Sequence, residues 1–148
     1  MAENVLMPEM SWTEVEEALK ERPVALLPVG TTEAHGPHLP VAADTVIAIE
    51  MARRTALKLK QRGQHALIAP PITLCVSELG AEFPGTVSLP PDTAVALLRD
   101  VSVALAKKFK REFGFAVDDA GLAFVEAAAA FAIEREMKAA KDDTGALD

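Results

Sequence analysis

Four side chains that can bind a metal ion or transfer a proton lie in one short stretch of this sequence. The segment TTEAHGPHLPVAADT, residues 31–45, contains Glu33, His35, His38 and Asp44. If the backbone is extended here, Glu33 and His35 point to the same face, because their positions differ by two. One imidazole and two carboxylates, from His35, Glu33 and Asp44, form a donor set that suits Zn²⁺, Mn²⁺ or Fe²⁺.

The same residue types also occur in an ordinary polar turn. Asp44 stands where a helix is expected to begin, so its carboxylate could serve only as the N-cap. Against that, Gly36, Pro37 and Pro40 restrict the loop and lower the entropy cost of bringing three ligands together. A catalytic metal commonly has three protein ligands and one open water position. Spacing alone therefore leaves a metal site and a capped polar turn both open.

The elements around this loop are expected to place it at the edge of a sheet. Hydrophobic runs and capping signals predict helices beginning at Ser11, Asp44 and Pro91, and strands over 24–30, 65–72 and 86–89. The order of strand, loop, helix and strand predicts a βαβ unit with a parallel sheet. The loop then follows the carboxyl end of the first strand, which is where ligands bind in open α/β sheets.

The helices are predicted from their caps and apolar faces. Ser11 and Glu14 have capping-box spacing, and Gly63 is expected to end the second helix. In that second helix the residues predicted to face the core are Val46, Ile49, Met51 and Leu57. In the third helix they are Val95, Leu98, Val101, Leu105 and Phe109, with Gly114 after its end. Lys107, Lys108, Lys110 and Arg111 then complement the dipole of its last turns.

Composition narrows the class of protein. The chain has 148 residues, enough for one domain with a single core, and half of them are hydrophobic. A net charge of −7 argues against nucleic acid as a partner. No apolar run is long enough to span a membrane, and the N-terminus does not read as a signal peptide. Cys75 is the only cysteine, which suits a reducing cytoplasm, where we expect the protein to act.

One long motif in the sequence is specific enough to indicate a protein family. The segment LLPVGTTEAHGPHLPVAADT resembles the signature of the creatininase family, the creatinine amidohydrolases and their relatives. The preceding WTEVEEALKERPVALLPVG and the later APPITLCVSELGAEFPGTVSLPPDTAVALLRDV resemble neighbouring parts of the same family. The resemblance covers about residues 11–113 of what we take as a single domain, with 114–148 as an alanine-rich helical tail.

The resemblance implies a three-layer α/β/α domain with a mostly parallel sheet and two divalent metals at the strand ends. It implies hydrolysis of an amide or cyclic amide C–N bond in a small molecule by a metal-activated water. Matched to the motif, Glu33 and His35 correspond to one ligand on each metal, and Asp44 corresponds to the bridging carboxylate. The family also implies a homo-oligomer, commonly a hexamer. His38 is interpreted as a loop-fixing residue, and His65 and Cys75 as structural.

Three departures from the family pattern bear on this interpretation. Ala34 stands where a glutamine is common, and Gly80 where a histidine is common. The third is that no second metal motif, a GHGGN-like turn, follows FKREFGF. In its place begins a segment expected to be helical over 120–141, with Asp118 or Asp119 as its cap. Two origins stay open, namely loss of one strand with a C-terminal truncation, or a large internal deletion.

Two classes of function follow from these departures. The first is a metal-dependent hydrolase that works with a reduced site. The second is a catalytically impaired family member that acts as a metal-binding or oligomer-forming subunit. A sheet that lacks a strand is expected to expose an edge or to borrow a strand from a partner, so we do not expect a stable monomer.

Overall fold

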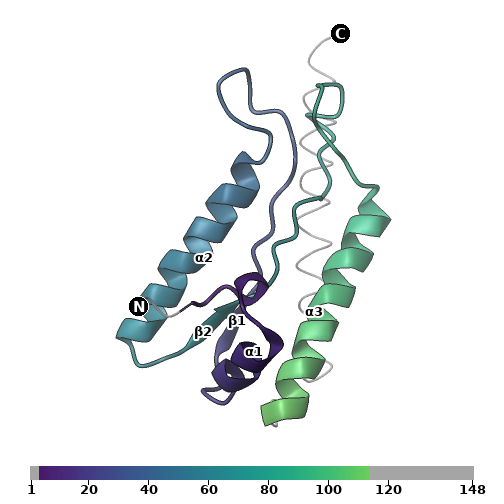
Figure 1. The fold of residues 1–148 in the computed structure, drawn as a ribbon. Helices are drawn as coiled ribbons and strands as arrows, with labels where there is room; N and C mark the ends of the chain where they lie inside the picture. The colour runs from purple at the N-terminus through teal and green to yellow at the C-terminus, as the bar shows by residue number, and fades with distance from the viewer. Residues whose placement is uncertain (1–3, 114–148) are drawn as a thin grey trace.

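The computed structural model describes residues 4–113, in which a small parallel sheet lies between helices (Figure 1). Strands β1 (Val24–Leu26) and β2 (Ala66–Ile68) pair in parallel. Helix α2 (Ala43–Gln61) packs on one side of them, and α3 (Pro91–Phe113) lies on the other, where it contacts α1 (Trp12–Leu19). The short 3-10 helix η1 (Met7–Glu9) precedes α1. The predicted α/β class with a parallel sheet is therefore confirmed, and β1–α2–β2 is the expected βαβ unit.

Both strands are shorter than the sequence predicts because prolines follow them. Pro28 has no N–H to donate, and beyond it the strands meet again only in an isolated bridge between Val29 and Ile72. The prediction that the first strand is buried is wrong. Val24 and the residue after it are exposed, because within residues 4–113 β1 has a strand neighbour on one side only. By contrast β2 is buried throughout, since Leu6 pairs with Ile68 on its other side.

The helix starts follow local capping rules with one exception. Ser11 caps α1 in a reciprocal capping box with Glu14, and α3 begins at Pro91, both as predicted. The prediction that Asp44 caps α2 is wrong. The N-cap is Ala42, without a side-chain hydrogen bond, and Asp44 lies inside the first turn. Its carboxylate is therefore not used as a cap.

The face of α2 that packs on the sheet carries smaller residues than expected. The residues of that face repeat at helical spacing: Thr45, Ile49, Ala52, Ala56 and Leu59. All of them except Thr45 pack around Ile68, which is fully buried at the centre of the core. Three residues predicted for the core, Val46, Met51 and Leu57, are instead exposed, because the narrow sheet covers only one side of α2.

A second core cluster joins α3 to the segment after β2. Val76 and Ala94 are buried there, with Cys75, Val95 and Leu98 packed against them. The predicted strand over 86–89 does not form. Val87 N–H donates to the Thr32 carbonyl (2.9 Å) and Leu89 N–H to the Cys75 carbonyl (2.9 Å), so the segment bonds to two different loops instead of one ladder.

Several expectations fall outside the residues that the structure describes. These are the side chains of Phe109, Lys110 and Arg111, the end of the third helix at Gly114, and the helix over 120–141 with its cap at Asp118 or Asp119. Among the helices that are described, none is long and apolar enough to cross a membrane.

Candidate metal centre

The three candidate ligands meet beyond the carboxyl end of β1. Glu33, His35 and Asp44 each offer one ligand atom, and these atoms all lie within 4.8 Å of one another. His35 Nε2 lies 3.0 Å from Asp44 Oδ1 and 3.7 Å from Glu33 Oε1. All three side chains are between a quarter and a third exposed, which leaves the cluster open to solvent. The structure thus brings together the residues that the sequence singled out, and their role as ligands stays a prediction.

A close approach of two backbones places Asp44 beside the loop. A Cβ atom on Gly30 would lie only 2.6 Å from the backbone nitrogen of Thr45, so only glycine fits where the chain leaves the sheet against α2. Gly30 N–H also donates to the Ile72 carbonyl (2.9 Å), which fixes the loop to the segment after β2. The sequence showed this glycine only as the end of a strand.

Hydrogen bonds divide the two oxygens of the Asp44 carboxylate between two partners. Thr31 Oγ1 donates to Oδ2, while Oδ1 faces His35 Nε2. The loop itself is closed by a hydrogen bond from Glu33 N–H to the Val41 carbonyl (3.0 Å). Asp44 is therefore held in one orientation, with Oδ1 directed to the centre of the cluster.

The two ring nitrogens of His35 have different surroundings. Nδ1 lies 3.1 Å from the Glu33 carbonyl oxygen, which can only accept, so we assign a proton to Nδ1. Nε2 faces two carboxylates. The hydrogen bond to the Glu33 carbonyl raises the pKa of His35 above 6.5, and the negative charges of Asp44 and Glu33 add to it, while desolvation opposes them. These interactions favour the imidazolium form more than in a free histidine, and a proton on Nε2 would occupy the place that a cation would take.

A second loop, which includes the FPGT motif, contacts the loop over residues 31–45 that carries the cluster. Ala34 N–H donates to Thr86 Oγ1 (3.0 Å), and Thr32 Oγ1 donates to the Thr73 carbonyl (2.8 Å). Gly85 has φ +92°, and a Cβ there would lie 3.1 Å from Val41 Cγ1. The FPGT loop therefore packs directly on the loop that carries the cluster. Figure 1 shows the two loops at the same end of the molecule.

Three hydroxyl residues near the site were not predicted from the sequence. Thr31 orients Asp44, and Thr86 binds the backbone between Glu33 and His35. Ser77 is buried, and its hydroxyl has no hydrogen-bond partner among the atoms described. For Thr31 and Thr86, a position inside the motifs VGTTEAH and FPGT was the only available signal, and Ser77 lies in neither motif. Which hydroxyl faces which loop depends on the fold.

The remaining candidates lie apart from the cluster. His38 is exposed, and its ring lies within 3.3 Å of where a Cβ of Gly36 would be, which fits a role in the shape of the loop. His65 pairs with Glu21 at 3.6 Å at the far end of β2. Cys75 is half-buried beside the second core cluster, as expected of a structural residue.

The family model for Creatininase, described as creatinine amidohydrolase, matches residues 8–142. The chain belongs to the creatininase family. The match is wider than the resemblance over 11–113, because it extends into the alanine-rich tail. The matched range includes the loop over 31–45, and the role of its side chains as metal ligands stays a prediction.

Curated relatives in the family carry different names. A "Mycofactocin precursor peptide peptidase" from Mycolicibacterium smegmatis is 43% identical over 68 residues, which is 45% of this chain and 28% of the relative. The "Creatinine amidohydrolase" of Pseudomonas putida is 28% identical over 113 residues, 72% of this chain and 42% of the relative. This chain thus spans less than half the length of the curated relatives that it matches.

Solved creatininase structures share the fold. A structure of creatinine amidohydrolase superposes with a TM-score of 0.62 at 28% identity, over 72% of this chain and 41% of the other. A structure described as "Creatininase Mn" gives 0.61 at 29% identity, over 71% and 41%. Creatininase has thus been solved in a form named for manganese, and another is described as "Zn-Zn type".

Proposed function

We propose that this chain holds a divalent cation through Glu33, His35 and Asp44 and hydrolyses an amide C–N bond. The observation that carries the proposal is the convergence of the three ligand atoms within 4.8 Å. Creatinine amidohydrolase and a peptide peptidase are both named for cleaving amide bonds, which supports the reaction class. The substrate class is a small molecule with a linear or cyclic amide, or a peptide amide.

The residues of the cluster fit a borderline-hard cation. One imidazole nitrogen and carboxylate oxygens are the donors that Zn²⁺, Mn²⁺ and Fe²⁺ accept. Two carboxylates close to one another favour a positive charge between them, which a bound cation or a protonated His35 ring can supply. A bound divalent cation would lower the pKa of a water molecule and polarise the scissile carbonyl.

The chain's own groups prepare the site for that chemistry. The Nδ1–H bond to the Glu33 carbonyl fixes the ring of His35 so that Nε2 points to the cluster. Nε2 must lose its proton before it can act as a ligand, so uptake of the cation releases a proton. Thr31 occupies Oδ2 of Asp44 and leaves Oδ1 for the cation. Glu33 supplies the third donor, with its Oε1 3.7 Å from His35 Nε2.

The test uses matched histidine variants of the full chain. Creatinine and a short formylated or peptide amide are incubated with added Mn²⁺ or Zn²⁺. Ring opening of creatinine is measured as the creatine formed, and cleavage of the linear amide as the amine released. We expect turnover in the wild type, a loss of at least about 100-fold in His35→Ala, and no change in His65→Ala. His65 is a suitable control because it lies outside the cluster and pairs with Glu21.

Metal analysis of the same proteins separates the two classes of function. Metal bound through His35 without turnover on any amide would contradict the hydrolase and support the alternative, a metal-binding subunit. Equal metal content in the wild type and in His35→Ala would contradict both, because both require the cluster as the metal site.

A further inference from the structure

A groove between α1 and α2 lies apart from the metal cluster, and no side chain of the cluster lines it. The volume of the groove is about 1040 Å³. Sites for small molecules and cofactors commonly have volumes of about 300–1,000 Å³, so the groove is large enough to hold a ligand. The hydrolysis proposed above makes no use of this region.

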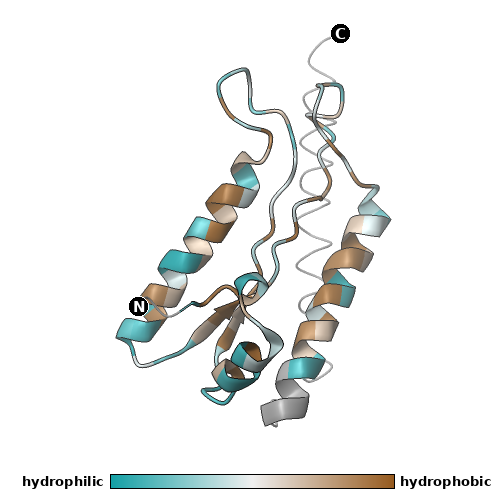
Figure 2. Ribbon diagram, in the orientation of Figure 1, coloured by the Kyte–Doolittle hydropathy of each residue, from teal (hydrophilic) through white to brown (hydrophobic). Residues whose placement is uncertain are grey.

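The lining between the two helices is mostly apolar. It comes from the N-terminal segment, through Val5 and Met10, and from β2, through Ala66 and Leu67. Figure 2 shows β2 as hydrophobic, while both helices carry hydrophilic residues. Leu57 adds an exposed apolar side chain from α2. The groove can therefore take up the apolar body of a ligand.

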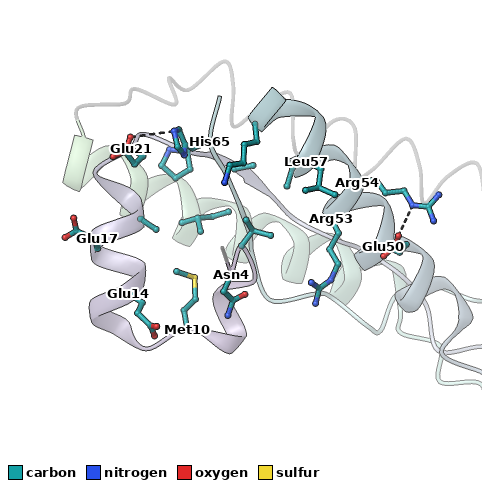
Figure 3. Close-up of a pocket in the computed structure, with 17 residues that line it drawn as sticks. Asn4, Met10, Glu14, Glu17, Glu21, Glu50, Arg53, Arg54, Leu57 and His65 are labelled. Carbon is teal, nitrogen blue, oxygen red and sulfur yellow. Dashed lines mark hydrogen bonds and ion pairs between the residues drawn. The ribbon is translucent and has the colours of Figure 1, made fainter. Parts of the chain in front are cut away.

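The side of the groove formed by α1 is acidic. Glu14 and Glu17 lie on α1, and Glu21 lies two residues after the end of this helix. Their positions differ by three and four, so the carboxylates follow one side of the helix and of the turn after it. Figure 3 shows them on the same side of the groove. Among the described lining residues, every arginine and lysine belongs to the other helix.

The opposite side, formed by α2, is mainly basic. Arg53, Arg54 and Lys60 line it, together with the acid Glu50. Arg54 Nε donates to Glu50 Oε1 at 2.8 Å, and Arg53 Nη2 lies 3.6 Å from Oε1 of Glu9 in η1. Within the described residues, neither arginine pairs with a carboxylate of the acidic side. The charges of the arginines and of the acidic side are thus held apart across the groove.

We propose that the groove binds a zwitterionic ligand, with a cationic group and a carboxylate at opposite ends of an apolar body. A short apolar peptide has this form. The cationic end would lie against Glu14, Glu17 and Glu21, and the carboxylate against Arg53 and Arg54. Charge complementarity favours this occupant, because a ligand of one sign would be repelled from one side of the groove. Since none of these residues belongs to the metal cluster, binding here does not depend on the proposed function.

The expected affinity is modest. The side chains of Glu17 (73%) and Arg54 (66%) are mostly exposed, so water and salt screen their charges. A ligand must also compete with the existing pairs of Glu17 with Lys20 and of Glu21 with His65. Because exposed ion pairs contribute little each, we expect a dissociation constant on the order of 0.1–1 mM at low salt.

Three peptides of equal length separate the effect of charge from that of apolar contact. The first consists of lysine, two leucines and glutamate with free ends, and carries both charges. The second keeps only the cationic end, with a glutamine amide in place of the glutamate. The third keeps only the anionic end, with an acetylated glutamine in place of the lysine. Isothermal titration calorimetry on the full chain at low salt is expected to show the first peptide binding at least about fivefold more tightly than the others.

Variants that neutralise one charge on each side test where the peptide lies. Glu17→Gln and Arg53→Gln are each expected to weaken binding of the zwitterionic peptide by about two- to fivefold, and the double variant by about the product. Glu17→Gln is also expected to weaken the cationic peptide but not the anionic one. The matched controls are Glu16→Gln on α1 and Arg99→Gln on α3, which do not line the groove. His35→Ala is expected to bind the peptide as the wild type does.

Circular dichroism checks that all variants are folded, and turnover enters none of these measurements, so a chain without hydrolase activity leaves the test intact. The proposal would be overturned if the wild type did not bind the zwitterionic peptide, including the case of a dimer whose second copy fills the groove. Equal affinity for all three peptides would contradict selection by charge. Wall variants that bind as their controls do would place the peptide outside the groove, and loss of binding in His35→Ala would place it at the metal cluster.

Discussion

Charged side chains lie close together in two regions, the cluster at the strand ends and the groove between α1 and α2. The groove has a volume of about 1040 Å³. Glu14 and Glu17 of α1 and Glu21, just after that helix, line one side of it, and Arg53 and Arg54 of α2 belong to the other (Figure 3). None of its lining residues belongs to the metal cluster.

The two regions differ in how the charges are balanced. In the groove, acids meet bases in exposed pairs, such as Glu21 with His65 (3.6 Å) and Glu50 with Arg54 (2.8 Å). At the strand ends, two carboxylates converge on one imidazole. Exposed pairs of opposite charge contribute little and need no further ion. Convergence of like charges, and not the size of a cavity, is what indicates a cation site here.

The largest effect is expected from the glycine that builds the strand-end region. Gly30→Ala would place a methyl group 2.6 Å from the Thr45 backbone nitrogen, and we expect it to lower the free energy of unfolding by about 3 kcal/mol. Gly63→Ala, near the groove, meets no atom within 4 Å and strains only its φ of +72°, so about 1 kcal/mol is expected. Urea denaturation of both variants measures the difference. Equal losses would contradict the close approach at Gly30.

Removing one carboxylate charge from each region tests whether the strand-end cluster, and not the groove, binds the metal. Asp44→Asn is expected to weaken Mn²⁺ or Zn²⁺ binding by at least about 100-fold, because the cluster loses a donor that bears a full charge. Glu21→Gln in the groove is expected to leave metal affinity unchanged. Isothermal titration calorimetry gives affinity and stoichiometry, with about one ion per chain expected for the wild type. Comparable metal affinities in Asp44→Asn and Glu21→Gln would contradict the proposal that the strand-end cluster, and not the groove, binds the metal.

A smaller loss is expected when only the orientation of a ligand is disturbed. Thr31→Val deletes the hydrogen bond to Asp44 Oδ2 but leaves all three ligands, so metal affinity is expected to fall by about tenfold. Thr55→Val is the matched control, since the Thr55 hydroxyl bonds only the Met51 carbonyl within α2. Calorimetry measures the metal affinity of both variants. A Thr31→Val protein with the metal affinity of the wild type would show that the hydrogen bond from Thr31 is not needed to orient Asp44.

The smallest effect concerns the proton on His35 in the metal-free protein. Because its pKa is raised above 6.5, the charged ring contributes stability that is fully present below pH 6.5 and is lost as pH rises through the raised value. NMR titration should give a midpoint above 6.5 for His35 and a lower one in Asp44→Asn. Metal affinity should fall as pH decreases through that midpoint, since the proton and the cation compete for Nε2. A midpoint at or below 6.5 would contradict this account of the ring.

Part of the fold and the site could be read from local sequence. Ser11 and Glu14 form the predicted capping box, and Pro91 begins α3, because capping depends on residues only a few positions apart. The three candidate ligands follow from one continuous motif. Contacts between distant segments could not be read in the same way, so the strand predicted over 86–89 is in fact a segment divided between two loops.

The sequence by itself determined the family, the βαβ order and the identity of Glu33, His35 and Asp44 as the candidate donors. Only the tertiary structure decided that Asp44 does not cap α2, because the packing of α2 against Gly30 turns its carboxylate toward Thr31 and His35. It also decided which face of α2 is buried. The face with alanine and threonine fits close to the strands, so the larger side chains of Ile47 and Leu57 remain outside. Hydropathy ranks residues one at a time, whereas burial depends on how closely two backbones can approach.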